Sequence, residues 1–166
     1  MPSPLGHALG GLAAGWLVSS TQVRQRDLIN SAWFAAAGMV ADLDLLVGAH
    51  SGPSHSLGAA GLVGLLCFLV TRRSRFTLAM TAAYASHILL DWLGNDSAPP
   101  IGIMALWPFS REHYESSVHL FYAISRRYWQ PDFWTLNVRA VIREVIVLVP
   151  PTALIGYARR ARSDRL

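Results

Sequence analysis

Five apolar stretches, each long enough to form a helix, alternate with short polar connections along this chain of 166 residues. They cover roughly residues 6–20, 28–47, 56–71, 77–94 and 136–158. The stretches are rich in Ala, Leu and Gly, and they lack the alternation of apolar and polar residues that half-buried strands show. The pattern predicts an all-α fold, a bundle of about five helices, in a single domain over residues 1–166.

Two parts of the chain depart from this regularity. Pro150 and Pro151 should kink or split the last helix, because proline removes a backbone donor and clashes with the preceding turn. Residues 95–135 begin with GNDSAPPIG, a helix stop and loop, and continue into an aromatic-rich region. We expect this outer region to be irregular, with one short helix near 114–128.

The composition favours a membrane-embedded bundle. Charged residues make up 14% of the chain and hydrophobic residues 52%, whereas a soluble domain carries about 25% charged residues. The uncharged stretches are short in comparison with the roughly 20 apolar residues that a membrane-spanning helix needs. The first residues, MPSPLG, lack the basic region of a signal peptide, so we expect the first helix to be retained. Exposed aromatic residues should form a belt at the membrane surface: Tyr122, Tyr128, Trp129, Phe133 and Trp134. A buried aromatic core would give a similar pattern.

All fourteen basic residues are arginines, and their positions predict a topology. They concentrate after the first, third and fifth stretches, at Arg24 and Arg26, at Arg72, Arg73 and Arg75, and at Arg159, Arg160, Arg162 and Arg165. Five crossings would place these clusters on one side, which the positive-inside rule makes the cytoplasm. We expect a multi-pass protein with a cytoplasmic C-terminus and membrane lipid as a partner. A nucleic-acid partner is not expected, because its binding face would run as a stripe along one element.

Histidines and aspartates interrupt the apolar stretches, and the same crossings bring them to the end of the bundle opposite the arginines. They are His7, Asp42, Asp44, His50, His55, His87 and Asp91. His87 and Asp91 are four residues apart and share a helix face, so they can bind one metal ion or bridge two. Neutral imidazole and carboxylate suit zinc and similar ions. The convergence predicts a metal site.

Each of these residues alone has a plainer explanation. His87 and Asp91 could form a structural hydrogen-bonded pair. Asp42 and Asp44 lie two apart, on nearly opposite faces of a continuous helix, so one of them supports the site or the helix loosens before residue 48. The other candidates fit caps and loops when taken singly: His7, His50, Ser54, Ser56, and the pair His113 and His119, whose spacing does not share a helix face.

The segments LGHALGG, ADLDLL, HSGPSHS, YASHILLDWL and LWP, in this order, resemble the YdjM-type family, described as LexA-regulated, membrane-bound, metal-dependent hydrolases of bacterial inner membranes. The resemblance covers about residues 5–110. It implies the metal ligands His7, Asp42, Asp44, His55, His87 and Asp91, with His50 and Ser56 supporting them or filling a further site. Ala41, Leu45, Ser51 and Ser54 stand where the family pattern has proline, histidine, arginine and threonine. The missing arginine could have bound a phosphate oxygen, so it affects the substrate more than the metal.

That family is distantly similar to zinc-dependent phospholipase C and single-strand nucleases, which are all-helical. The resemblance implies a hydrolase that cleaves a phosphoester, such as a phospholipid, with a water activated by one to three zinc ions. Asp42, Asp44 and Asp91 would be the catalytic carboxylates, one of them as general base. Two alternatives stay open: a non-catalytic membrane scaffold, and an ion or proton pathway, which should distribute His and Asp across the bilayer depth. The sequence leaves the substrate and the oligomeric state open.

Overall fold

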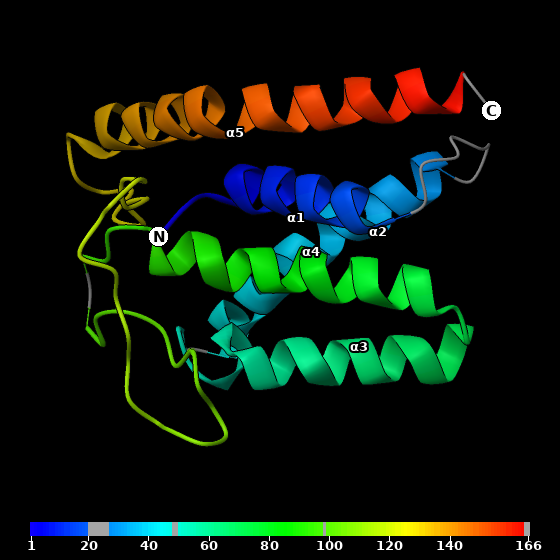
Figure 1. Ribbon diagram of the computed structural model, residues 1–166. Coiled ribbons are helices and arrows are strands. Elements are labelled where there is room, and N and C mark those ends of the chain that lie inside the picture. Colours follow the sequence, from blue (N-terminus) through cyan, green and yellow to red (C-terminus); the bar gives the residue numbers. More distant parts are fainter. Residues whose placement is uncertain (20–26, 48–49, 98, 165–166) are drawn as a thin grey trace.

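The computed structural model describes residues 1–19, 27–47, 50–97 and 99–164. Its helices are α1 (Pro4–Val18), α2 (Asp27–Met39), α3 (Leu57–Thr71), α4 (Ser74–Trp92) and α5 (Phe133–Ser163), with short 3₁₀ helices η1 (Val40–Val47) and η2 (Pro53–His55). These residues form no strand beyond two isolated bridges, so the all-α prediction is confirmed. In Figure 1, α5, α1, α4 and α3 lie side by side from top to bottom, and α2 passes behind.

The helix ends follow from local chemistry. α1 begins after Ser3, whose side chain accepts a backbone hydrogen bond of the first turn, and Pro4 occupies a position where no intrahelical donor is needed. α3 begins after Ser56, whose Oγ accepts a hydrogen bond from the Ala59 amide at 3.0 Å. It ends at Thr71, and the next residue, Arg72, takes the left-handed conformation with φ 53°. Serine caps therefore set where both helices start.

The stretch predicted as one helix over 28–47 changes its geometry part-way. α2 ends at Met39, and the chain continues as the 3₁₀ helix η1. A 3₁₀ helix has about three residues per turn, so residues two apart are separated by about 120° instead of the roughly 160° of an α-helix. Asp42 and Asp44 therefore point less directly away from each other, and both reach the His55 ring. Their spacing in the sequence suits a site only because the helix tightens here.

Small residues let α1 and α2 approach closely. A Cβ atom added to Gly11 would lie 2.5 Å from the Phe34 carbonyl oxygen, and one added to Gly38 would lie 2.3 Å from the His7 carbonyl oxygen. Gly15 makes room for the Phe34 ring in the same way. Phe34 packs in a core cluster with the buried residues Ala37, Ala79 and Ala83. The contact fixes the depth at which α1, and with it His7, lies in the bundle.

α5 is longer than predicted, and it is not split. Pro150 and Pro151 lie inside one continuous helix, so the predicted split is wrong. Each proline removes only one backbone hydrogen bond, and the neighbouring turns keep theirs. The Thr152 hydroxyl adds a hydrogen bond to the Leu148 carbonyl oxygen at 2.7 Å, within the same turns. The helix therefore continues through both prolines.

The described residues of 95–132 form turns and extended segments at the end of the bundle where α4 stops and α3 starts (Figure 1). The short helix predicted near 114–128 is wrong, because the backbone there pairs with neighbouring segments. The Ser116 amide donates to the Trp92 carbonyl oxygen at 3.0 Å, and the Leu120 amide donates to that of Leu93 at 2.8 Å. These bonds tie the segment to the end of α4.

The two ends of the bundle differ in chemistry. The connection between α3 and α4, with Arg72 and Arg73, and the first turn of α4, with Arg75, lie at the right of Figure 1 with the end of α5. The start of α1, the start of α3 and the end of α4 lie at the left. Arg24, Arg26 and Arg165 lie outside the described residues. Arg72, Arg73 and Arg75, together with the arginines at the end of α5, thus lie opposite the histidines and aspartates, whereas Arg139 and Arg143 lie in the first half of α5, toward the outer region.

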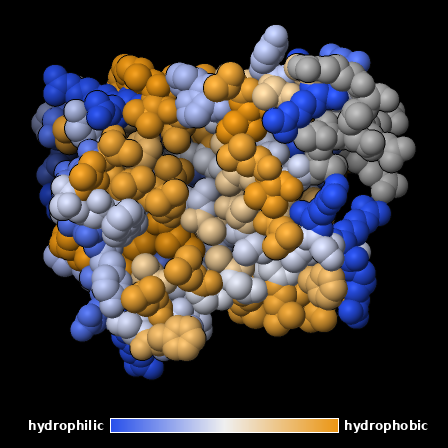
Figure 2. Space-filling view, viewed as in Figure 1, coloured by the Kyte–Doolittle hydropathy of each residue, from blue (hydrophilic) through white to orange (hydrophobic). Residues whose placement is uncertain are grey.

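None of the helices in the described ranges is both long enough and apolar enough to cross a membrane. Hydrophobic side chains nevertheless occupy much of the surface, as the orange residues in the middle of Figure 2 show. The aromatic residues of the outer region also face outward: Tyr122, Tyr128, Trp129 and Trp134 are all exposed. Their exposure argues against a buried aromatic core formed by these four residues.

Candidate metal centre

Three histidines and one aspartate meet at one end of the bundle. His7 on α1, His55 on η2 and His87 on α4 are each 0% exposed, and Asp91 on α4 is 2% exposed. Asp91 Oδ1 lies 3.3 Å from His7 Nε2, whereas Asp91 Oδ2 lies 3.1 Å from His87 Nε2 and 3.3 Å from His55 Nε2. The His7 and His87 rings stack with centroids 3.7 Å apart. We call these four residues the central cluster.

Several polar atoms of the central cluster have no hydrogen-bond partner. In the described part of the chain, the unpartnered buried side-chain atoms are His7 Nδ1 and Nε2, His55 Nε2, His87 Nε2 and both carboxylate oxygens of Asp91. Leaving one such atom unsatisfied costs about 1–3 kcal/mol, so native proteins contain few of them. Donors about 2.0–2.1 Å from a tetrahedral ion lie roughly 3.3 Å apart. The distances from the Asp91 carboxylate to the three imidazole Nε2 atoms, 3.1 to 3.3 Å, are close to that value, and donor atoms of His7, His87 and Asp91 all lie within 4.8 Å of one another.

Two of the imidazoles are turned toward the centre by a group behind them. His87 Nδ1 lies 2.7 Å from the carbonyl oxygen of Gly38 on α2, which can only accept, so the hydrogen sits on Nδ1 and leaves the Nε2 lone pair free. His55 Nδ1 lies 3.1 Å from Asp44 Oδ2, so its Nε2 is the ring nitrogen that faces the centre. Carbonyl and carboxylate partners of this kind typically orient metal-binding histidines.

The two aspartates of η1 lie on either side of His55. Asp42 Oδ1 lies 3.6 Å from His55 Nε2 and 3.7 Å from His87 Nε2, at the edge of the central cluster. Its side chain is 20% exposed, so it lies on the solvent side of the cluster. Asp44 contacts the other ring nitrogen of His55 and also accepts a hydrogen bond from Ser54 Oγ at 2.7 Å. The structure therefore places Asp42 with the other predicted ligands and Asp44 behind His55.

His50 and Ser56, predicted as supporting groups or a further site, have different positions. His50 Nδ1 lies 3.2 Å from Asp44 Oδ1, and donor atoms of His50, Asp42 and His55 all lie within 4.8 Å of one another. This second group adjoins the central cluster and could hold a further ion. Ser56 Oγ is engaged instead in the turn before α3, where it donates to the Pro53 carbonyl oxygen at 2.6 Å and caps the helix.

Sequence comparison agrees with the resemblance seen in the motifs. The family model described as the YdjM inner membrane protein matches residues 1–161. The chain belongs to the YdjM inner membrane protein family. The match extends past residue 110, so it also includes the outer region and α5. Comparisons with curated proteins and with solved structures found no match.

Burial and charge shift the pKa values in this YdjM family protein. Burial alone would lower the pKa of His55, but its contacts with Asp42 and Asp44 and the charge of Asp91 raise it to about 9. Burial would raise the pKa of Asp44, whereas His55 and Ser54 lower it to about 2. The imidazoles of His7 and His87 outweigh burial at Asp91 and hold the pKa of its carboxyl well below the usual range. Protonated His55 thus offsets carboxylate charge in the metal-free protein, and a divalent cation would supply that charge instead.

Three residues of the site were missed or misjudged from the sequence. Gly38 was not considered, although a small residue in an alanine-rich helix indicates a close helix contact. Ser54 was interpreted as a helix cap, but its hydroxyl contacts Asp44 and His55. Tyr84 OH donates to the Ser54 carbonyl oxygen at 2.6 Å, one helical turn before His87. All three hold ligand-bearing segments rather than contribute donors to the central cluster.

The remaining histidines lie outside both groups. His119 Nε2 lies 3.3 Å from Glu115 Oε1, and its side chain is partly exposed. His113 belongs to neither of the described groups that could hold a metal ion. Both residues are therefore useful as comparison positions for experiments on the cluster.

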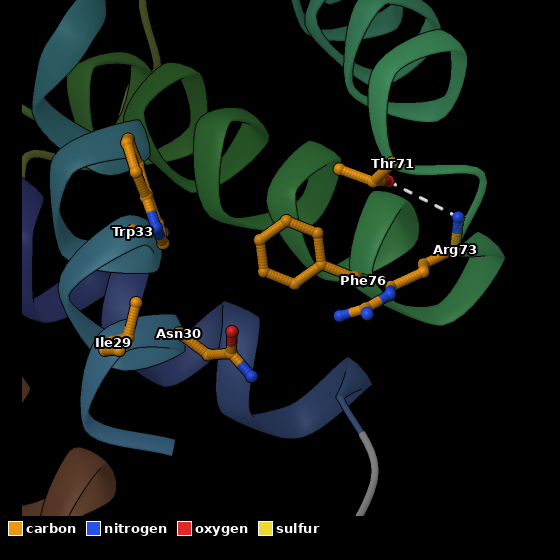
Figure 3. A pocket seen from close by; sticks show the side chains of 6 residues that line it. All are labelled: Ile29, Asn30, Trp33, Thr71, Arg73 and Phe76. Atoms are coloured by element: carbon orange, nitrogen blue, oxygen red, sulfur yellow. Dashed lines mark hydrogen bonds between the residues drawn. The ribbon is translucent and has the colours of Figure 1, made fainter. Parts of the chain in front are cut away.

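A cavity of about 420 Å³ lies at the opposite end of the bundle (Figure 3). Its lining residues are Ile29, Asn30, Trp33, Thr71, Arg73 and Phe76. Thr71 is the last residue of α3, whereas His55 precedes the first, so a helix about 22 Å long separates the cavity from the central cluster. The lining contains no His, Cys, Asp or Glu, and we assign the cavity no part in metal binding.

Proposed function

We propose that this YdjM family protein is a membrane-bound, metal-dependent hydrolase that cleaves a phosphoester bond. The observation that supports it most directly is the set of buried His and Asp donors without hydrogen-bond partners. A purely stabilising role explains these donors poorly, because a packed apolar cluster would avoid the desolvation of buried charges. Perturbed carboxylates and histidines gathered at one place are typical of functional sites.

The proposed ligands are His7, His55, His87 and Asp91, with Asp42 at the solvent side. We propose zinc, because three imidazoles that each lie close to one carboxylate suit that ion. Asp42, His50 and His55 would hold a second ion, since their donor atoms also lie close together. The site would then contain one or two ions that share Asp42 and His55.

The chain's own residues suit a hydrolytic reaction. Bound zinc would lower the pKa of a coordinated water toward 7 and neutralise charge on a phosphoryl group. We propose Asp42 as the general base, because its side chain reaches solvent while Asp91 is enclosed by three imidazoles. Asp44 would keep Nε2 of His55 directed at the centre. Asp91 would therefore bind the ion, Asp44 would position His55, and Asp42 would take the proton.

A lipid phosphoester is the proposed substrate class, and the hydrophobic surface near the site supports it. Phe109, which is 96% exposed, and Leu106 lie in a turn at residues 105–109, and the Ala105 carbonyl oxygen accepts a hydrogen bond from Leu57 at the start of α3. α3 continues this surface with a row of exposed side chains: Leu62, Leu65, Leu66, Leu69 and Val70. Large exposed apolar patches mark contacts with membrane or protein. For an inner membrane protein family we propose lipid.

None of the described helices is both long and apolar enough to cross a membrane by itself, so the topology we propose is inferred from the arginines: multi-pass, with the central cluster toward the outer face and the C-terminus in the cytoplasm. The arginines at the opposite end of the bundle support this orientation. A Cys67→Ser background allows single cysteines to be introduced at Phe109 and at Ser163. In intact spheroplasts, a membrane-impermeant maleimide should label position 109 and not position 163. Labelling at 163 alone would contradict the proposed orientation.

Metal binding is tested by elemental analysis of zinc-reconstituted, dialysed protein. Wild type and the control His119→Ala should retain at least one zinc ion per chain, and His87→Ala should lose it. The control removes an exposed histidine outside the cluster, so it shows how much general histidine binding contributes. No zinc above background in wild type, or equal zinc in His87→Ala, would remove the basis of the proposal.

Hydrolysis is tested on vesicles of phosphatidylethanolamine and phosphatidylglycerol and on a small chromogenic phosphodiester. The wild type should release product, a chelator should abolish the release, and added zinc should restore it. Asp42→Asn should lower the rate by about 10²–10⁴-fold, as expected for loss of a general base. Zinc binding without hydrolysis of either substrate would favour the scaffold alternative over the enzyme.

A further inference from the structure

α5 contacts the bundle through a narrow row of residues. Of its 31 residues, Ala140, Glu144, Thr152 and Arg159 are buried, and the helix packs mainly against α1. Two of these four residues are ionisable. Glu144 contacts Ser3 at the start of α1, at the end of the bundle that carries the central cluster, and Arg159 contacts Trp16 and Asp27 toward the opposite end. A fully buried carboxylate on an otherwise exposed helix calls for a specific partner.

The partner of Glu144 is the first residue of the α1 cap. Glu144 Oε1 accepts a hydrogen bond from the Ser3 amide at 2.6 Å, and Oε2 accepts one from the Ser3 hydroxyl. Gly6 allows this approach, because a Cβ atom there would lie 2.8 Å from Glu144 Oε2. A carboxylate at a helix N-terminus is also favoured by the helix dipole. In both contacts Ser3 donates and Glu144 accepts. The amide side chain of glutamine has only one acceptor oxygen, so it cannot reproduce both hydrogen bonds.

His7 depends on this same turn. Its amide donates to the Ser3 carbonyl oxygen at 3.1 Å, so His7 lies one turn after the residue that Glu144 binds. Gly38 orients His87, and Asp44 orients His55, but neither ring nitrogen of His7 has a hydrogen-bond partner. The position of the His7 ring is therefore set by the backbone of α1 and by packing against His87.

We propose that Glu144 is a positioning residue for the metal centre: by holding Ser3, it fixes the first turn of α1 and thereby places the donor nitrogen of His7. This inference rests on the proposed metal-binding function. It assigns a role to α5, which contributes no ligand to the central cluster. Glu144 acts through Ser3 and His7 and does not itself bind the ion.

The test compares Glu144→Gln with Arg159→Gln, the other buried ionisable contact of α5. Arg159 donates to the Trp16 carbonyl oxygen at 2.9 Å and pairs with Asp27 at 3.1 Å, near the far end of α1, so its loss should weaken the same helix contact without touching the first turn. Zinc affinity is measured by competition with a chromophoric chelator. Cobalt reconstitution reports the ligand geometry through the visible spectrum, and urea unfolding in chelator reports stability.

Glu144→Gln should lower zinc affinity by about tenfold or more, as lost supporting contacts do, and should weaken the visible cobalt bands. Arg159→Gln should lose comparable stability and keep both the affinity and the spectrum. In a His7→Ala background, Glu144→Gln should have no further effect on affinity. Ser3→Ala keeps the contact of Glu144 with the Ser3 amide but removes the hydroxyl contact and the cap bond to the Gly6 amide. It should therefore also lower zinc affinity, and it serves if Glu144→Gln fails to fold.

Two failures are distinguishable. If wild type binds no zinc or cobalt, the proposed function fails and the role of Glu144 fails with it. If wild type binds zinc and Glu144→Gln or Ser3→Ala binds it equally well, only the positioning role is overturned. The same holds if Glu144→Gln and Arg159→Gln lower affinity equally, because the effect would then reflect general loosening of α5.

Discussion

Replacing Gly38 by alanine should damage both the packing of α1 against α2 and the metal centre. The new Cβ would lie 2.3 Å from the His7 carbonyl oxygen and 2.9 Å from Gly11 Cα, whereas ordinary Cβ contacts lie at 3.4–4 Å. The two helices must therefore separate by about 1 Å. Over-packing of this kind costs about 1–3 kcal/mol, and the better helix propensity of alanine offsets up to about 1 kcal/mol of it.

The separation also changes the support of His87. Gly38 carries the carbonyl oxygen that lies 2.7 Å from His87 Nδ1, so moving α2 lengthens this contact and frees the ring to turn. Loss of a supporting contact typically lowers metal affinity by about 10–100-fold. Urea unfolding of the metal-free protein measures the loss of stability, and zinc competition with a chromophoric chelator measures the loss of zinc affinity.

Two glycines provide matched controls. Gly15→Ala places a Cβ 2.3 Å from the Phe34 ring, in the same pair of helices but two turns from His7, so it should destabilise the fold and leave zinc affinity unchanged. Gly61→Ala meets no atom within 4 Å and should be neutral or slightly stabilising. If Gly38→Ala loses as much unfolding free energy as Gly15→Ala but binds zinc as tightly as wild type, the role of Gly38 in orienting His87 is refuted.

Three further predictions concern the supporting residues and the surface. Asp44→Asn should lower zinc affinity by about 10–100-fold while the metal-free fold is kept; unchanged affinity would show that Asp44 does not orient His55. In chelator, the free energy of unfolding should be higher at pH 6 than at pH 9.5, because protonated His55 stabilises the fold below its unfolded pKa and this contribution is lost as pH rises through its folded pKa of about 9; a flat or rising profile in urea unfolding would contradict that. Phe109→Asp should weaken binding to anionic vesicles in a flotation assay relative to the exposed polar control His119→Ala, and equal flotation of both would argue against the 105–109 turn as a lipid contact.

The sequence predicted the helices well where apolar runs were long. α1, α3 and α4 agree with the expected ranges to within a few residues, because serine caps and arginine-containing turns mark their ends. The outer region was less predictable, since its backbone bonds to residues far along the chain, such as Asn95 to Phe121. Of the kink or split expected at Pro150 and Pro151, the split does not occur, because the turns on either side keep the helix continuous.

The candidate site, too, could be predicted from the sequence only in part. The spacing of His87 and Asp91 was enough to place both side chains on one face of α4. The roles of Asp42 and Asp44 could not be separated, because they depend on the 3₁₀ geometry of η1 and on His55 lying between the two carboxylates. Gly38 acts through a backbone carbonyl, which no side-chain pattern reveals. Glu144 lies 141 residues from Ser3, so only the folded chain brings them together.

The most direct measurement of the metal centre is an anomalous-difference map from zinc-reconstituted crystals, recorded at the zinc absorption edge. A peak should lie among His7 Nε2, His55 Nε2, His87 Nε2 and the carboxylate of Asp91, about 2.0–2.2 Å from each donor. A second peak beside Asp42 and His50 would show two ions. A map with no peak among these four side chains would contradict a metal centre at this end of the bundle.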